Sequence, residues 1–151
     1  KFVGGTYIIL RTSWVFSIYN DNFVKKILKL SKSNKQLTVV SDQIGGPTSA
    51  EDIANAILKV ADKVVADNRV FGIYHFSGEK DISRANFARY ILKKAKIDLP
   101  VIGTPTSKYP NSVQRPLNSR LDCSKMYDVF GIRRPDWKSA LHNDLINLKV
   151  L

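Results

Sequence analysis

The sequence is poor in the side chains that build disulfides and zinc sites: among 151 residues it has one cysteine and two histidines. Cys123 has no second cysteine with which to pair, and no histidine stands near it at the spacing of a zinc ligand set. We therefore expect neither a structural metal nor a redox centre in this chain.

Long apolar runs are missing as well. None approaches the roughly 20 residues that a helix needs to cross a bilayer, and residues 1–14 lack the cleavage region of a secretory signal. These absences predict a cytoplasmic protein with no membrane partner. The chain does have 44% hydrophobic and 25% charged residues, spread evenly, which is typical of one packed domain.

Acidic residues are scarce: the sequence has 13 of them and 24 lysines and arginines, which gives a formal net charge of +11. Such an excess can attract the phosphates of a nucleic acid. Lys25, Lys29 and Lys32, however, recur at i, i+4 and i+7 on one side of a predicted amphipathic helix, which is the pattern of a solvated helix face. No nucleic-acid-binding motif accompanies them, so we expect no nucleic-acid partner.

The order of elements predicts an α/β fold. Tyr7–Leu10 is a short apolar run, as in a strand of a parallel sheet that is covered on both faces. A helix capped by Asp21 or Asn22 follows and runs to about Ser33, and Leu37–Val40 reads as a second strand.

Thr48 and Glu51 have the spacing of a capping box, and the helix that they begin runs to about Ala66. Gly72–Phe76 reads as a third strand, and Ser83 opens a further helix.

The last third of the chain differs from the rest in composition. The segment 100–118 holds four of the six prolines and is predicted to be extended or looped. A short helix over about Cys123–Val129 ends at Gly131, and a last helix begins near Trp137.

The chain supplies too few strands to cover the two apolar ones. We therefore expect residues 1–151 to be a single truncated domain, in which segments 6–16 and 70–78 belong to a larger parallel sheet whose other strands lie upstream of Lys1.

Two short patterns suggest chemistry but have simpler explanations. Gly45-Gly46-Pro47-Thr48 precedes a helix, where backbone amides can bind phosphate, but it matches neither phosphate-loop motif, and a turn accounts for it. Tyr90 and Lys94 have the Tyr-x-x-x-Lys spacing of a proton-transfer pair, yet no glycine-rich cofactor loop precedes them, and we reject the match.

Two other places are stronger candidates for binding. Trp14 comes just past the end of the first strand, where α/β sheets hold ligands, so its ring either stacks on a sugar or base or fills the core. Arg115 and Arg120 lie in a proline-containing loop, and the planar guanidinium group suits a diphosphate, although a plain surface loop is the alternative.

An ordered set of motifs runs through nearly the whole chain. They are RTSWVF at 11–16, NFV at 22–24, DQIGGPT at 42–48 followed by Glu51-Asp52, PTS-x-YP at 105–110, RP-x-NS-x-LD at 115–122, and RPDW at 134–137. Together they resemble the carboxyl-terminal half of the dTDP-4-dehydrorhamnose reductases, which are extended short-chain dehydrogenase/reductases.

The resemblance implies a fold and an activity for the protein to which the chain belongs. The fold is α/β and Rossmann-like, and the chain lacks the amino-terminal cofactor-binding half. The activity is reduction of the 4-keto group of a dTDP-linked 6-deoxyhexulose with NADPH or NADH, which yields dTDP-L-rhamnose for polysaccharide synthesis. The family's glycine-rich loop and catalytic Tyr-x-x-x-Lys lie upstream, so the resemblance implies that the chain has no catalytic residue, binds no cofactor and is inactive alone.

The resemblance also implies six residues that bind the dTDP-sugar: Trp14, Asn22, Phe23, Val39, Val40 and Arg115. By this comparison Trp14 packs on the deoxysugar, Arg115 pairs with the diphosphate, and Asn22 and Phe23 touch the diphosphate from a helix start. The two valines lie on the strand next to the base. Gln43 and Ser119 belong to family motifs, but no contact is assigned to them.

Some family members dimerise through a magnesium cluster that includes the glutamate matching Glu51. The carboxyl-terminal partner position is Asn147 here, so a magnesium-bridged homodimer is not expected, and other homodimers stay open. Ser17 stands where the family commonly has glycine. The alternative to an enzyme part is a non-catalytic regulatory protein similar to the beta subunit of methionine adenosyltransferase.

Overall fold

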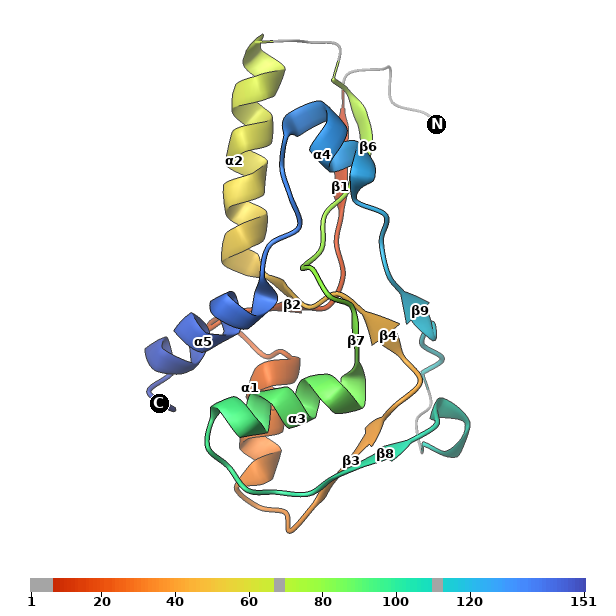
Figure 1. Ribbon diagram of the computed structural model, residues 1–151, viewed down its shortest axis with the longest axis vertical. Coiled ribbons are helices and arrows are strands. Elements are labelled where there is room, and N and C mark those ends of the chain that lie inside the picture. The colour runs from red at the N-terminus through yellow and green to blue at the C-terminus, as the bar shows by residue number, and fades with distance from the viewer. Residues whose placement is uncertain (1–6, 67–69, 110–112) are drawn as a thin grey trace.

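The structure is a computed structural model that describes residues 7–66, 70–109 and 113–151, with Ala66 described by its backbone alone. The predicted boundaries at residues 1 and 6, and Pro110 of the quoted motif, lie outside the described residues. The chain forms two packed parts that are joined by short strands (Figure 1). In the described residues, no helix is long and apolar enough to cross a membrane.

The first part is built on two parallel strands, β1 (Ile8–Arg11) and β6 (Gly72–His75), with Ile8 opposite Gly72 and Arg11 opposite His75. Helices α2 (Ala50–Ala66) and α4 (Ser124–Phe130) lie beside this pair (Figure 1). Their side chains form one hydrophobic cluster: Ala56, Val60, Tyr74, Phe76 and Met126.

Within the described residues the first strand is covered on one face only, and its predicted burial on both faces within a larger sheet stays a prediction. Ile8 and Leu10 pack on the cluster under α2 and α4, whereas Ile9 is 46% exposed and Ile73, its partner in register, is 36% exposed. The reason is that this sheet has two strands and helices on one of its faces only.

The second part contains α1 (Phe23–Ser31), α3 (Arg84–Lys94) and the parallel strands β3 (Leu37–Val40) and β8 (Val101–Thr104). Helix α5 (Trp137–Asn147) packs beside them (Figure 1). The described residues of the segment 100–118 are largely extended or looped, as predicted, but the pairing of β8 with β3 was not foreseen. The segment also contains the short helix η1 (Thr106–Lys108).

Helix starts follow the capping residues. The side chain of Asn22 accepts the N–H of Lys25, so Asn22 and not Asp21 caps α1, and Ser83 in the same way caps α3 through Asn86. Helix α4 ends at Gly131, which has a φ of +68° as the left-handed C-terminal position requires.

Phe87 on α3 is the centre of the larger core. Its ring centroid lies 5.6 Å from that of Phe23, 6.1 Å from that of Phe16 and 5.2 Å from that of Trp137. These contacts join α1, the chain after β1, and α5 to one helix, so the larger core holds the second part together.

Short strands connect the two parts. They are β2 (Val15–Phe16) paired with β5 (Thr48–Ser49), and β7 (Ile82–Ser83), β4 (Ile44–Gly45) and β9 (Asn118–Ser119) side by side in that order.

Thr48 is buried in β5 and does not form the predicted capping box. Its hydroxyl donates to the carbonyl oxygen of Ser13 at 2.8 Å, lies 3.1 Å from that of Gly46, and accepts the N–H of Gly78 at 3.2 Å. Helix α2 begins at Ala50, and it is the Ser49 hydroxyl that accepts the N–H of Glu51. The tertiary bonds of Thr48 thus replace the local cap that the spacing suggested.

Asp144 on α5 is 8% exposed, and one of its carboxylate oxygens has no hydrogen-bond partner in the described structure. Burial, together with the nearby carboxylates of Glu51 and Asp52, raises the pKa of Asp144. The junction of α2 and α5 is therefore a place where negative charges crowd.

Candidate functional site

A cavity of about 820 Å³ lies between α1 and β3, and the loops that follow β1 and η1 reach it. All six residues implied as substrate-binding line this one cavity: Trp14, Asn22, Phe23, Val39, Val40 and Arg115. They come from segments up to about 100 residues apart in sequence, which the fold brings together. Their role in binding stays a prediction.

Trp14 lies three residues after the end of β1 and has a strained backbone conformation. Its φ is +47°, which is a genuine outlier for a bulky side chain. The backbone on either side is held in place, because Ser13 donates its hydroxyl to the Gly46 carbonyl at 2.9 Å and Thr48 donates its N–H to the Trp14 carbonyl at 3.2 Å. The fold thus enforces a conformation that aims the indole ring at the cavity wall.

Gly45 and Gly46 serve packing and not phosphate binding. A side chain at Gly45 would place its Cβ 2.8 Å from Cε2 of Trp14, and one at Gly46 would lie 2.6 Å from the carbonyl oxygen of Gly78. Both glycines are buried. The predicted turn into a capping box is not formed, because Gly45 ends β4 and Thr48 begins β5. Close approach of other residues explains why glycine stands at positions 45 and 46.

Arg84, the first residue of α3, is a cavity residue that the sequence interpretation missed. Its guanidinium carbon lies 3.8 Å from the ring centroid of Trp14 and 4.9 Å from that of Phe23. Burial, and next the positive charge of Arg115, lower the pKa of Arg84 to about 10. No carboxylate or hydrogen-bond acceptor pairs with this guanidinium in the part of the chain that the structure describes.

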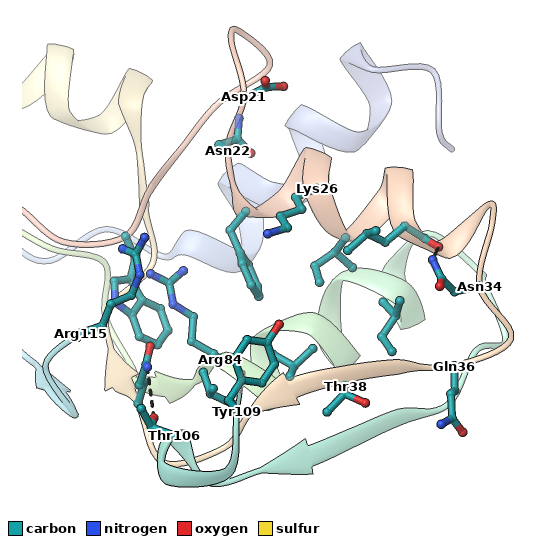
Figure 2. Close-up of a pocket in the computed structure, with 18 of the residues that line it drawn as sticks. Asp21, Asn22, Lys26, Asn34, Gln36, Thr38, Arg84, Thr106, Tyr109 and Arg115 are labelled. Atoms are coloured by element: carbon teal, nitrogen blue, oxygen red, sulfur yellow. Dashed lines mark hydrogen bonds between the residues drawn. The ribbon is translucent and has the colours of Figure 1, made fainter. Parts of the chain in front are cut away.

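The cavity is therefore cationic at the end where the arginines lie. Figure 2 shows Arg84 and Arg115 reaching the same end of it, with the Lys26 ammonium group pointing into the space between α1 and the arginines. Lys26 was also missed, because the sequence interpretation considered only Lys25, Lys29 and Lys32 of this helix and assigned them to its solvated face. A site with several cations and few anions suits a phosphate-bearing ligand.

A polar network fixes the loop that brings Tyr109 to the cavity. Asp42 accepts the N–H of Thr106 at 2.9 Å and its hydroxyl at 2.7 Å, and Gln43 donates to the same hydroxyl oxygen at 3.2 Å. The hydrogen bonds from Thr106 lower the pKa of Asp42. The backbone carbonyl oxygen of Gln43 also accepts the backbone N–H of Arg84. The motif at residues 42–48 therefore orients both walls of the cavity.

The opposite end of the cavity is formed by neutral groups. Asn34, Gln36 and Thr38 lie there, away from Arg84 and Arg115 (Figure 2). The cavity thus offers cations and aromatic rings at one end and neutral amide and hydroxyl groups at the other, which suits an elongated ligand that is charged in one part only.

Several other candidates lie outside this cavity. Arg120 donates to the side-chain oxygen of Asn118 at 2.9 Å, and Lys94 lies against the ring of Tyr90, which packs on Trp137. His75 bonds the backbone oxygen of Asp122 at 3.1 Å. No group of three His, Cys, Asp or Glu side chains is placed to hold a metal ion within residues 7–66, 70–109 and 113–151.

The comparisons with known proteins define the class. Residues 3–150 match the family described as the RmlD substrate binding domain, so this chain belongs to that family. It is 43% identical over 143 residues to the dTDP-4-dehydrorhamnose reductase of Aggregatibacter actinomycetemcomitans, a match that covers 90% of this chain and 49% of the relative. The corresponding reductase of Sinorhizobium fredii is 41% identical over 140 residues, covering 89% of this chain and 47% of the relative.

Solved structures agree with the sequence relatives. The dTDP-4-dehydrorhamnose reductase of Clostridium acetobutylicum superposes with a TM-score of 0.86 at 32% identity, covering 95% of this chain and 49% of that one. The Bacillus anthracis enzyme, solved in complex with NADP, gives a TM-score of 0.80 at 30% identity, covering 93% of this chain and 48% of that one. The α/β, Rossmann-like fold class is thereby confirmed, and the chain spans about half the length of the relatives it matches.

Proposed function

We propose that this chain is the nucleotide-sugar-binding half of a dTDP-4-dehydrorhamnose reductase. The parent enzyme reduces dTDP-4-dehydro-6-deoxy-L-mannose to dTDP-L-rhamnose with NADPH or NADH in the cytoplasm. The observation that carries the proposal is that one cavity gathers all the residues expected to bind the dTDP-sugar.

In this proposal each part of the ligand has its own place in the cavity. The diphosphate lies at Arg115 and at the start of α1, where Asn22 caps the helix and backbone N–H groups favour negative charge. The deoxysugar lies at Trp14. The base lies along β3, beside Val39 and Val40.

The residues of this chain bind and orient the sugar nucleotide and do not transfer hydride. The sequence contains no G-x-G-x-x-G loop, so its residues do not fit a dinucleotide cofactor. Tyr90 packs on Trp137 and Lys94 is exposed beside the Tyr90 ring, and neither residue lines the cavity. We place the catalytic tyrosine and lysine and the cofactor site in the missing amino-terminal Rossmann half.

Segments 6–16 and 70–78 are proposed to belong to the sheet of that missing half. The exposed side chains of Ile9 and Ile73 support this, because further sheet-covering elements would bury them. A homodimer is compatible with the proposal, and it is not required by it.

The test is titration calorimetry of the protein with dTDP-L-rhamnose and with dTDP, repeated at higher salt. We expect tighter binding of the sugar nucleotide and a salt-dependent contribution from the diphosphate. Binding of neither ligand by the complete protein that carries this chain would contradict the proposal, as would NADPH oxidation by residues 1–151 alone with the keto-sugar.

Substitution of the cavity residues tests the assignment. Arg115→Ala is expected to weaken binding by about 1.5–3 kcal/mol, the value of hydrogen bonds to a charged group, and Trp14→Ala is expected to weaken binding of the sugar nucleotide more than that of dTDP. Arg120→Ala is the matched control, since this arginine belongs to the same loop but lies outside the cavity. Equal affinity in wild type and both cavity variants would remove the site assignment.

A further inference from the structure

The proposed function gives no role to Arg84. Arg84 is a partly buried residue whose guanidinium group contacts two aromatic rings and has no acceptor among the described residues. Burying a cation without a partner is costly. Arg84 also shares its end of the cavity with Arg115, so two like charges face each other there.

The position of Arg84 is fixed by the fold. Its backbone N–H donates to the carbonyl oxygen of Gln43 at 3.1 Å, and the Ser83 hydroxyl caps the helix that it begins. The side chain makes no hydrogen bond or ion pair within the described residues, whereas its Cα is held beside the cavity. The guanidinium group can therefore exchange the ring face for an acceptor inside the cavity without any change in the backbone.

We propose that Arg84 is the second phosphate-binding cation of the site. When the ligand binds, the Arg84 guanidinium group moves from the face of Trp14 to the diphosphate, which it shares with Arg115. The indole ring then becomes accessible to the sugar. This inference rests on the proposed function, since it names a further residue for the same ligand. An anion placed between the two guanidinium groups removes their mutual repulsion and supplies the acceptors that Arg84 lacks.

The ring face gives a second reason for the exchange. At 3.8 Å the guanidinium group occupies the surface on which a sugar would stack, while Gly45 packs on the same indole. A sugar that stacks on the covered face needs Arg84 to turn away first. Binding of the diphosphate therefore prepares the contact with the sugar.

The experiment compares Arg84→Gln with Lys93→Gln, which removes the same charge from the same helix at an exposed position outside the cavity. Affinities are measured by calorimetry for dTDP-L-rhamnose, dTDP and dTMP. We expect Arg84→Gln to weaken dTDP binding by about tenfold or more, as the loss of a charge-assisted hydrogen bond does, and to weaken dTMP binding much less. Lys93→Gln should behave as wild type, and Arg84→Lys should recover part of the preference for dTDP.

Tryptophan emission provides an independent readout. The difference between wild type and Trp14→Phe isolates the signal of Trp14 from that of the buried Trp137. We expect dTDP, which has no sugar, to change this signal in wild type and not in Arg84→Gln. An unchanged signal in wild type, or an unchanged preference for dTDP over dTMP in Arg84→Gln, overturns the inference.

Arg115→Gln separates this inference from the proposed function. If Arg115→Gln loses dTDP affinity while Arg84→Gln matches Lys93→Gln, the function stands and the role of Arg84 is wrong. If the complete wild-type protein that carries this chain binds none of the three ligands, the proposed function fails and the role of Arg84 fails with it.

Discussion

Gly45→Ala is predicted to destabilise the protein through one contact, that with Trp14. The new Cβ would lie 2.8, 2.9 and 3.1 Å from three atoms of the indole ring. Carbon atoms in contact are about 3.5–4.0 Å apart, so the ring has to move by about 0.7 Å or more. It cannot move freely, because the Trp14 backbone is held at a φ of +47° by the hydrogen bonds of Ser13 to Gly46 and of Thr48 to Trp14.

Overpacking of this kind costs about 1–3 kcal/mol. Chemical denaturation followed by circular dichroism measures that cost, and a double-mutant cycle with Trp14→Ala assigns it. In the Trp14→Ala background, Gly45→Ala should cost less than about 0.5 kcal/mol, because the clashing ring is gone. Gly131→Ala is the control: its Cβ meets nothing within 4 Å and its φ is +68°, so its cost should be the same with or without Trp14. An equal cost of Gly45→Ala in both backgrounds would refute the reasoning.

Two further predictions concern stability. Asp144→Asn should raise the Tm at pH 7 by about 2–4 °C, the shift that about 1 kcal/mol gives in a protein of this size. Because the folded pKa of Asp144 is raised above its usual 3.8, its destabilising effect grows as the pH rises from about 3.8 to the folded value and is constant above it, so the gain should vanish below about pH 4 in thermal scans across pH. Ser83→Ala removes the cap of α3 and should cost about 1 kcal/mol in urea denaturation, whereas Ser107→Ala, at an exposed position within η1, should cost less; the reverse order would contradict the capping argument.

The elements that sequence reasoning placed well are those with local signals. Asn22 and Ser83 cap helices through their own side chains, and Gly131 ends one through its own φ. Strand Leu37–Val40 was predicted with the bounds it has, because its residues combine apolar character with branching at Cβ.

The features that were missed depend on distant residues. Thr48 has a capping-box spacing, yet its hydroxyl binds Ser13 and Gly78, which no local pattern reveals. Strand β8 was not foreseen because prolines dominate its segment, and its pairing with β3 is a tertiary contact.

The candidate site shows the same division. The motifs around Trp14 and Arg115 marked them as binding residues, and the resemblance added Asn22, Phe23 and the two valines of β3. No sequence motif indicates a binding role for Arg84, because an arginine in the first turn of a helix is normally expected to be exposed. Its burial arises only when the chain after β1 and α1 closes over it.

The bonds of Thr48 have a mechanical consequence. One hydroxyl oxygen joins the loop after β1, at Ser13, to the loop after β6, at Gly78. Trp14 follows Ser13 directly, and its carbonyl is bound by the same threonine's N–H. A displacement of β1 against β6 is therefore transmitted to the indole ring. An element that packs on the β1–β6 sheet and a ligand in the cavity are thus coupled through the side chain of Thr48.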